Sequence, residues 1–294
     1  MADIRQKGAF RLIGGDGGLA FYTRQKDRFE QVSAANTRWV LPNQKITALA
    51  VDKNNRLFIG TELGLAVVAG DRSHVDFYSN AVCGLGSNLI RALHLAADQT
   101  LWIGSTHSGL HAFNADTGNF QHWHIDLGAI NSPADDDVLR IIDDQDGTIW
   151  AATLSMGLAK MNSDKQSFTV YRRDNQTGSL KSNSIRDLLV DTDNTLWVAS
   201  DHGGLARFDA TSGQFITQQY SPFNPAGLSS NQVRSLFQDR DGNYWVGTFP
   251  NGINFYDQRK SRFKVFTQHQ NGANHLLSQG ILAIHEDKTG TIWV

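Results

Sequence analysis

Leu101-Trp102-Ile103-Gly104-Ser105, closed by Gly109-Leu110, is the clearest copy of a motif that returns along the whole chain. In each copy an apolar or β-branched run carries a Trp, or an apolar residue in its place. A Gly or Ala follows two residues later in the first six copies, and the seventh stops at Val294. The anchor stands at positions 12, 58, 102, 150, 197, 245 and 293. Successive anchors are 44 to 48 residues apart, a period typical of a repeat architecture.

The copy around Trp245 shows what one repeat contains. Asp241-Gly242, between two apolar runs, is typical of a tight β-hairpin turn. Short β-branched and aromatic runs with glycine punctuation indicate strands and not helices. The predicted strands cover residues 233–239, 244–248, 253–256 and 262–266. Four antiparallel strands in roughly 45 residues match one blade of a β-propeller.

We therefore expect residues 1–294 to form a single all-β propeller of four-stranded blades, with repeats that begin near residues 46, 90, 138, 185, 233 and 281. The N-terminal segment is expected to supply strands two to four of one further blade. Ile281–Glu286 supplies a first strand, and the start of a second follows it. Seven anchors favour seven blade positions with incomplete terminal blades. The alternative is six blades, closed by pairing of the N- and C-terminal strands.

The repeated residues have physical roles in such a fold. The indole fills the gap between neighbouring sheets and buries about 150–250 Å². The Gly or Ala two residues later leaves room for the backbone of the adjacent blade. A second set of glycines stands where a turn requires positive φ: Gly109, Gly157, Gly204 and Gly252.

Composition excludes several classes of function. A hydrophobic fraction of 40% and a charged fraction of 19% indicate a globular chain, and a net charge of −2 gives no basic footprint for nucleic acid. Cys83 is the single cysteine, so no internal disulfide is expected. Neither a membrane span nor a signal peptide is apparent, and Val294 falls inside a repeat. We therefore expect this chain to be a piece of a larger protein.

Residues 228–236, 239–243 and 244–253 together resemble the two-component regulator propeller repeat. The resemblance recurs in every unit and covers nearly the whole chain. Ala152 and Ala199 depart from it, because the family usually has glycine there, and Leu12 stands where the family has tryptophan.

This resemblance implies a non-catalytic, periplasmic, ligand-sensing region of a bacterial inner-membrane receptor. Propellers of this family are usually seven-bladed and precede a β-sandwich, a membrane helix and an output module such as a histidine kinase or diguanylate cyclase. The implied partners are a small-molecule or oligosaccharide ligand and the membrane-coupled output domains. No cofactor and no nucleic-acid partner are implied, and a homodimer stays open.

An arginine recurs at one position of the predicted first strands, as Arg91, Arg140, Arg186 and Arg234. First strands lie innermost in a propeller, so these guanidiniums are candidates for docking a carboxylate, phosphate or sulfated sugar. The alternative is a set of structural ion pairs, which repetition at equivalent positions favours.

The turns between second and third strands vary where the rest of the repeat is regular. The residues that vary there are Glu62, His107, Met156, Asp201, His202, Phe249 and Asn251. Among them the His, Asp, Asn and aromatic side chains suit hydrogen bonding to, or stacking on, a sugar, and His107, His202, Phe249 and Asn251 are taken as candidates. Ordinary solvated turns are the competing interpretation, because turns favour such residues in any case. The eight arginine and turn residues form the predicted ligand site.

Two patterns resemble parts of metal sites, but each has a simpler explanation. Asp144–Trp150 is similar to the Asp-box of sialidase propellers and to the start of a calcium loop, but its counterparts occupy the same hairpin in other repeats, which favours turn chemistry. His122 and His124 share one face of a strand without a third ligand. We therefore predict no metal site.

No nucleophile elbow, P-loop, dinucleotide fingerprint or HExxH motif is present. We therefore expect no catalytic residues. Two alternatives remain to the sensor interpretation: a propeller glycosidase or lyase with paired carboxylates at the channel mouth, and a protein-interaction scaffold with an exposed apolar patch.

Overall fold

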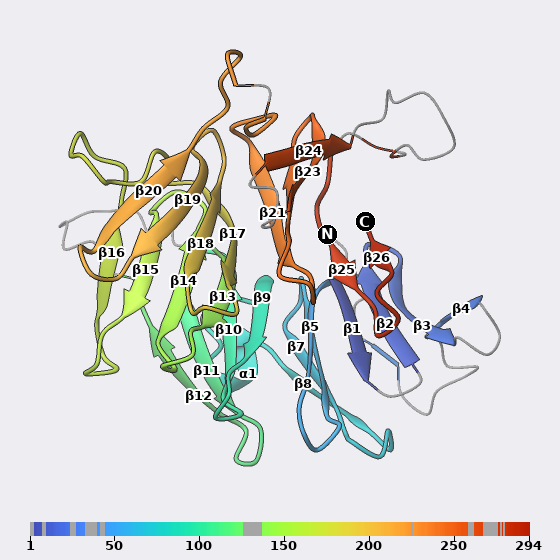
Figure 1. Cartoon of the computed structure of the whole chain (residues 1–294). Helices are drawn as coiled ribbons and strands as arrows, with labels where there is room; N and C mark the ends of the chain where they lie inside the picture. The colour runs from blue at the N-terminus through green and yellow to red at the C-terminus, as the bar shows by residue number, and fades with distance from the viewer. Residues whose placement is uncertain are drawn as a thin grey trace. The chain divides into compact units, whose positions relative to one another are not determined.

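The structure is a computed structural model that describes residues 3–7, 10–23, 28–32, 40–41, 45–125, 137–224, 226–257, 262–266, 276, 278 and 280–294. The chain divides into two compact units, Met1–Ile141 and Ile142–Val294. The described residues are mostly β-strand, as Figure 1 shows, and contain one short helix, α1 (Asn80–Cys83).

Unit 1 contains three four-stranded antiparallel sheets with strands in chain order. The first consists of β1 (Asp3–Lys7), β2 (Phe10–Gly15), β3 (Gly18–Thr23) and β4 (Arg28–Gln31). The second consists of β5 (Ile46–Val51), β6 (Leu57–Thr61), β7 (Leu65–Val68) and β8 (Val75–Tyr78). The third consists of β9 (Ile90–Leu95), β10 (Leu101–Ser105), β11 (Leu110–Asn114) and β12 (Asn119–Trp123).

The fourth sheet has the boundary between the units within its first strand. It consists of β13 (Val138–Asp143), β14 (Ile149–Thr153), β15 (Leu158–Met161) and β16 (Phe168–Tyr171). The fifth consists of β17 (Ile185–Val190), β18 (Leu196–Ser200), β19 (Gly204–Asp209) and β20 (Gln214–Gln218). The sixth consists of β21 (Val233–Gln238), β22 (Tyr244–Thr248), β23 (Gly252–Asp257) and β24 (Arg262–Phe266). A last pair consists of β25 (His285–Glu286) and β26 (Ile292–Trp293).

These sheets confirm the predicted all-β propeller fold with four-stranded antiparallel blades. The described residues form six complete blades, the number that the alternative gave, and the preference for seven is not confirmed. The pairing expected to close six blades is wrong. β1 pairs with β2, so the first blade takes its first strand from the N-terminal segment, while β25 pairs with β26.

Neighbouring blades interlock at the position two residues after the anchor. A Cβ built on Gly60 would lie 2.6 Å from Cγ2 of Ile90, and one built on Gly104 would lie 2.7 Å from Cγ1 of Val138. Ile90 and Val138 each begin the first strand of the following blade. The small residue was expected to make room for backbone. At Gly104 it does, because the backbone carbonyl of Val138 would also lie 2.7 Å from the added Cβ, and at both glycines it makes room for the β-branched side chain as well.

The anchor indole lies between sheets, as expected. Trp150 is 2% exposed, and its ring centroid lies 5.2 Å from that of Phe208 in the third strand of the next blade. Phe215 and Leu188 of that blade belong to the same core cluster. Positive φ at the predicted turn glycines is also confirmed, for example 97° at Gly157.

An aspartate organises the hairpin between first and second strands. Oδ1 of Asp191 accepts hydrogen bonds from the backbone N–H groups of Asp193 and Thr195, both at 2.9 Å, and Oδ2 accepts one from Nε1 of Trp197 at 2.7 Å. Equivalent bonds occur at Asp144, Asp239 and Asp287. The predicted turn chemistry is therefore present, with the indole as an additional donor. In the third blade Ala96 takes this place.

A second set of hydrogen bonds ties four of the hairpins between first and second strands to the next blade. The residue after the aspartate donates its backbone N–H to a side chain there, as Lys53 does to Oε1 of Gln99 (3.2 Å) and Gln145 to Oδ1 of Asn194 (2.9 Å). Gln99 and Asn194 occupy the positive-φ position of their own hairpins, with φ of 72° and 61°.

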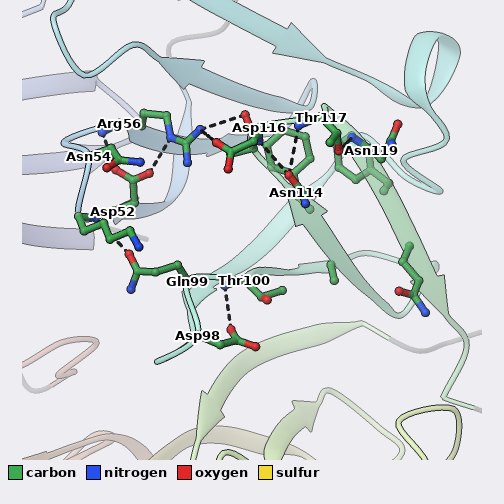
Figure 2. Close-up of a pocket in the computed structure, with 16 residues that line it drawn as sticks. Asp52, Asn54, Arg56, Asp98, Gln99, Thr100, Asn114, Asp116, Thr117 and Asn119 are labelled. Carbon is green, nitrogen blue, oxygen red and sulfur yellow. Dashed lines mark hydrogen bonds and ion pairs between the residues drawn. The ribbon is translucent and has the colours of Figure 1, made fainter.

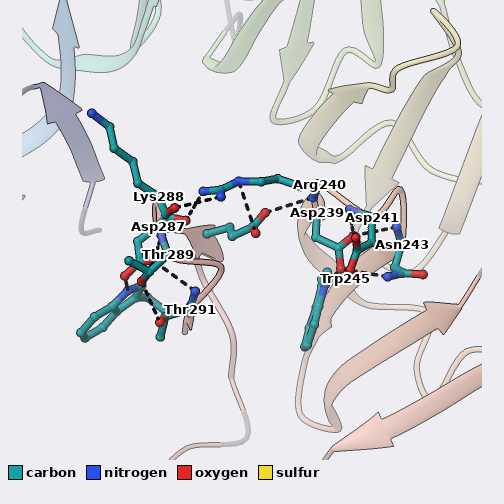
Figure 3. Close-up of polar contacts among 11 residues, drawn as sticks. Asp239, Arg240, Asp241, Asn243, Trp245, Asp287, Lys288, Thr289 and Thr291 are labelled. Atoms are coloured by element: carbon teal, nitrogen blue, oxygen red, sulfur yellow. Dashed lines mark hydrogen bonds and ion pairs between the residues drawn. The ribbon is translucent and has the colours of Figure 1, made fainter.

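Where the next hairpin has glycine at that position, a different residue accepts the bond. The N–H of Thr192 donates to Oε1 of Gln238 (3.0 Å), and the N–H of Arg240 donates to Oε2 of Glu286 (3.1 Å). Gln238 and Glu286 directly precede the hairpin aspartate of their blades. Figure 3 shows the Arg240 connection, in which the guanidinium also donates to the backbone carbonyl of Lys288 at 3.0 Å.

Candidate functional site

Two of the predicted arginines meet at a single carboxylate in unit 2. Asp201 directly follows β18, and its Oδ2 lies 2.8 Å from Nη2 of Arg186 and 3.3 Å from Nη2 of Arg234. The arginine side chains are 26% and 25% exposed, and that of Asp201 is 11% exposed. One largely buried carboxylate therefore joins guanidiniums from the first strands of two neighbouring blades.

A β-bulge explains why the arginine side chains reach this place. Ile185 pairs with Ser200 and Asp187 pairs with Ala199, so Arg186 has no partner residue in the ladder. A bulge bends its strand and redirects the side chain of the extra residue. Equivalent irregularities leave Thr47, Arg91 and Arg234 out of the ladders of their blades.

Three further side chains surround the arginine–aspartate group. Nδ1 of His202 lies 3.2 Å from Oδ1 of Asp201, and Nε2 of His202 lies 3.2 Å from Nε2 of Gln232. The Phe249 ring lies under the Arg234 guanidinium, 5.8 Å from ring centroid to Cζ, and is 47% exposed. We call Arg186, Asp201, His202, Arg234 and Phe249 the Asp201 cluster.

The Asp201 cluster has spare capacity for an anion. Two guanidiniums face one carboxylate, so one positive charge in the cluster is not balanced. Nε of Arg186 is buried and has no hydrogen-bond partner among the residues that the structure describes. Guanidiniums bind planar carboxylates and phosphates through paired N–H donors, and a partly desolvated site strengthens such bonds.

The remaining predicted residues lie elsewhere. In unit 1, Nε of Arg91 donates to Oγ1 of Thr106 at 2.9 Å, and Arg140 is exposed on β13. His107 also belongs to unit 1; its backbone N–H donates to Oδ1 of Asp137 at 3.0 Å, and its Nδ1 lies 3.5 Å from the same oxygen. The structure thus brings together Arg186, Arg234, His202 and Phe249, and binding by any of the eight stays a prediction.

Asn251 is in unit 2 but does not belong to the Asp201 cluster. Its Nδ2 donates to the backbone carbonyl of Ser229, which fixes the segment before β21. Gln232 was missed by sequence reasoning, although it directly precedes the predicted strand of Arg234. Asp201 was among the variable turn residues, but its pairing with the two arginines was not foreseen.

The two predicted strand histidines belong to a group of three. The rings of His111 and His122 stack with centroids 4.3 Å apart, and those of His122 and His124 meet edge to face at 4.3 Å. Burial, and then the neighbouring His122 and His124, lower the pKa of His111 to about 3. Among the described residues no group of three or more His, Cys, Asp or Glu side chains is placed to hold a metal ion.

Known proteins share this fold. The extracellular domain of the putative hybrid two component system BT3049 from B. thetaiotaomicron is 20% identical, with a TM-score of 0.56 over 99% of this chain and 42% of that one. PorZ of Porphyromonas gingivalis, a surface component of the type-IX secretion system, is 15% identical, with a TM-score of 0.72 over 97% of this chain and 43% of that one. This chain therefore spans less than half the length of either protein.

A third relative is an enzyme. A catalytically inactive variant of virginiamycin B lyase from Staphylococcus aureus, bound to quinupristin, is 11% identical, with a TM-score of 0.69 over 97% of this chain and 87% of that one. No curated protein sequence matches the chain significantly. In the part of the chain that the structure describes, no helix is long and apolar enough to cross a membrane.

A family model matches the sequence itself. The model described as "Two component regulator propeller" matches residues 40–62, 179–202 and 227–249. Each matched segment includes a first strand and the second strand that follows it, and the last two end at the Asp201 cluster. The chain is therefore a β-propeller that carries two component regulator propeller repeats.

Proposed function

We propose that this chain is a non-catalytic, ligand-sensing propeller of an extracytoplasmic bacterial receptor, and that it binds a small anion or an acidic oligosaccharide at the Asp201 cluster. The matched repeats support the receptor role, as does the similarity to the extracellular domain of a hybrid two component system. The remaining parts of the proposal are a periplasmic location, membrane-coupled output domains beyond this chain and self-association as a homodimer.

The observation that carries the choice of site is the shared carboxylate. Arg186 and Arg234 come from different blades and both contact Asp201, at 2.8 and 3.3 Å. An incoming anion would satisfy the buried Nε of Arg186 and relieve the repulsion between two nearby guanidiniums. The structural alternative, in which the arginines only join blades, accounts for the ion pairs but leaves this Nε without a role.

Ligand binding would act on signalling through the two blades that supply the arginines. A ligand shifts a receptor only by binding one of its arrangements more tightly than the other. An anion that spans Arg186 and Arg234 would favour the arrangement in which β17 and β21 hold both guanidiniums close together. The output domains would sense that preference.

The double variant Arg186→Ala/Arg234→Ala tests this proposal against the structural alternative. Citrate and tetragalacturonate are suitable probes, because a ligand that binds only the folded state raises its melting temperature. We expect both to stabilise the wild type and neither to stabilise the double variant. Arg207→Ala, which removes an exposed arginine from β19 of the same unit, is the control and should respond like the wild type.

Two outcomes contradict the proposal. One is a wild type that neither anion stabilises, and the other is a double variant that keeps the full response. A double variant that does not fold would favour the structural role of the arginines. Arg186→Lys keeps the charge but loses the Nε donor. If this variant folds and no longer responds to the anions, the arginine binds ligand; if it folds and keeps the full response, the arginine has only a structural role.

The enzyme alternative, a propeller glycosidase or lyase, has less support in the site. A glycosidase needs two carboxyl groups about 5–9.5 Å apart, whereas the Asp201 cluster contains one carboxylate held by two arginines. The virginiamycin B lyase shares the fold, and a shared fold does not imply a shared activity.

A further inference from the structure

We propose that unit 1 has a binding site of its own, at the end of its strands where the β5–β6 and β9–β10 hairpins lie, for a neutral ligand rich in hydroxyl groups such as a short oligosaccharide. The site is a groove of about 640 Å³ formed by the β5–β6 and β9–β10 hairpins and the β11–β12 turn. This volume lies within the range of about 300–1,000 Å³ typical of small-molecule sites. Figure 2 shows its lining.

The groove has fixed walls. Arg56 extends from the second blade to the third, where Nη1 meets Oδ1 of Asp116 at 2.6 Å and the carbonyl of Ala115 at 3.0 Å. At its own hairpin, the Nε of Arg56 donates to Oδ2 of Asp52 at 2.6 Å. The bond from Lys53 N–H to Gln99 ties the same two blades a second time. A ligand would therefore meet a preformed groove, which lowers the entropic cost of binding.

Several polar side chains on these walls are not used by the fold. Lys53, Asn54, Asn119 and Gln121 are exposed, and within the described residues their side chains make no hydrogen bond. Asn119 and Gln121 are two residues apart on β12, so their amides share one face of the strand. Asn54 lies on the opposite wall, as Figure 2 shows. Amides can donate and accept at once, as hydroxyl groups do.

Charge and apolar surface narrow the ligand class. Arg56 pairs with both Asp52 and Asp116, and the lining adds the carboxylate of Asp98 and the ammonium of Lys53, so that three carboxylates stand against two cations. This near balance gives no strong attraction for an anion, unlike the Asp201 cluster, and none for a highly charged cation. Little apolar surface is offered for a hydrophobic ligand. A neutral molecule with many hydroxyl groups matches such a lining best.

The double variant Asn119→Ala/Gln121→Ala tests the groove. The probes are cellotetraose, maltotetraose, xylotetraose and mannotetraose, titrated calorimetrically into the whole chain up to millimolar concentration. We expect at least one to bind the wild type and its Kd to rise about tenfold or more in the double variant, equivalent to about 1.4 kcal/mol. Asn54→Ala, on the other wall, should also weaken binding.

Gln166→Ala, which removes an exposed amide from the β15–β16 turn, is the matched control and should bind like the wild type. Arg186→Ala/Arg234→Ala should also leave the affinity for these neutral sugars unchanged, so failure here is separable from failure at the Asp201 cluster. The proposal is overturned if none of the four sugars binds, or if Asn119→Ala/Gln121→Ala binds one as tightly as the wild type does.

Discussion

Asp191 provides the sharpest test of how each blade is held together. Its carboxylate accepts the two backbone N–H groups and the Trp197 indole described above, and in addition the Tyr244 hydroxyl of the next blade at 2.7 Å. The residue is 5% exposed. Asp191→Ala would leave four donors without their acceptor, two of them on aromatic side chains that pack between blades.

The size of the loss follows from these donors. The two backbone N–H groups lie in an exposed turn and can hydrogen-bond to water instead, so the loss of each bond should reduce the free energy of unfolding by about 0.5 kcal/mol. The loss of each aromatic side-chain bond should reduce it by about 1–1.5 kcal/mol. Asp191→Ala should therefore destabilise its unit by about 3–4 kcal/mol. At about 2–4 °C per kcal/mol for a unit of this size, the melting temperature should fall by roughly 6–16 °C.

The pH dependence gives a second readout. Burial raises the pKa of Asp191, but the hydrogen bonds from Trp197, Tyr244 and the backbone outweigh it, so the net pKa lies below its ordinary value. A lowered pKa in the folded state contributes stability that is fully present above the unfolded pKa of about 3.9 and is lost as the pH falls through the folded value. The difference between wild type and Asp191→Ala should therefore be constant near neutral pH and shrink below about pH 4.

Thermal unfolding followed by calorimetry and by tryptophan fluorescence, between about pH 3 and pH 7, measures both effects. Asp193→Ala is the matched control, because its exposed side chain lies in the same hairpin; it should shift stability by no more than about 0.5 kcal/mol. A loss for Asp191→Ala as small as that of the control, or one that does not change on acidification, would refute the reasoning.

Three other substitutions test neighbouring parts of the argument. Ala96→Asp should supply the missing hairpin carboxylate, bond the Trp102 indole and raise stability by about 1 kcal/mol; an unchanged melting temperature would show that the Trp102 ring does not face the turn. Gly60→Ala should cost about 1–3 kcal/mol in chemical denaturation, because the new methyl group would lie 2.6 Å from Ile90; a neutral result would mean that the neighbouring blade shifts freely. Asp201→Asn should lower the melting temperature, since it leaves two guanidiniums without a counter-charge, and adding chloride or citrate should restore part of the loss; a stable variant would contradict the ion-pair geometry.

The sequence predicted the blades well because the repeated residues act locally. An indole, a small residue two places later and a turn glycine each have one physical role that recurs with the period. The first strand of the first blade was missed because Asp3–Lys7 has one apolar residue, Ile4, among four polar or charged ones. Nothing in that composition indicates a strand, and its pairing with β2 supplies the reason that it forms one.

The site was only partly predictable. The arginines were found by their repetition. The bulge that redirects their side chains depends on the pairing of two strands, and neither Ile185 nor Asp187 is a residue type that predicts a bulge. The pairing of Arg186 and Arg234 with one Asp201 likewise depends on contacts between residues 15 and 33 positions apart in the chain. The groove could not be predicted from the motif, because it lies at hairpins that the motif explained as turns.

The hydrogen bonds that tie four hairpins to the following blade have a consequence for protein engineering. Where a hairpin has Gln or Asn at the positive-φ position, that side chain accepts the backbone N–H of the preceding hairpin. Where the position holds Gly242 or Gly290, the side chain of Gln238 or Glu286 accepts it instead. A blade moved to a new position in a ring must therefore carry one of these acceptors. Without any of them, the hydrogen bond from the preceding blade is lost. Shuffled or consensus-designed propellers that omit the acceptor should therefore have weakly associated blades, even when each blade folds correctly.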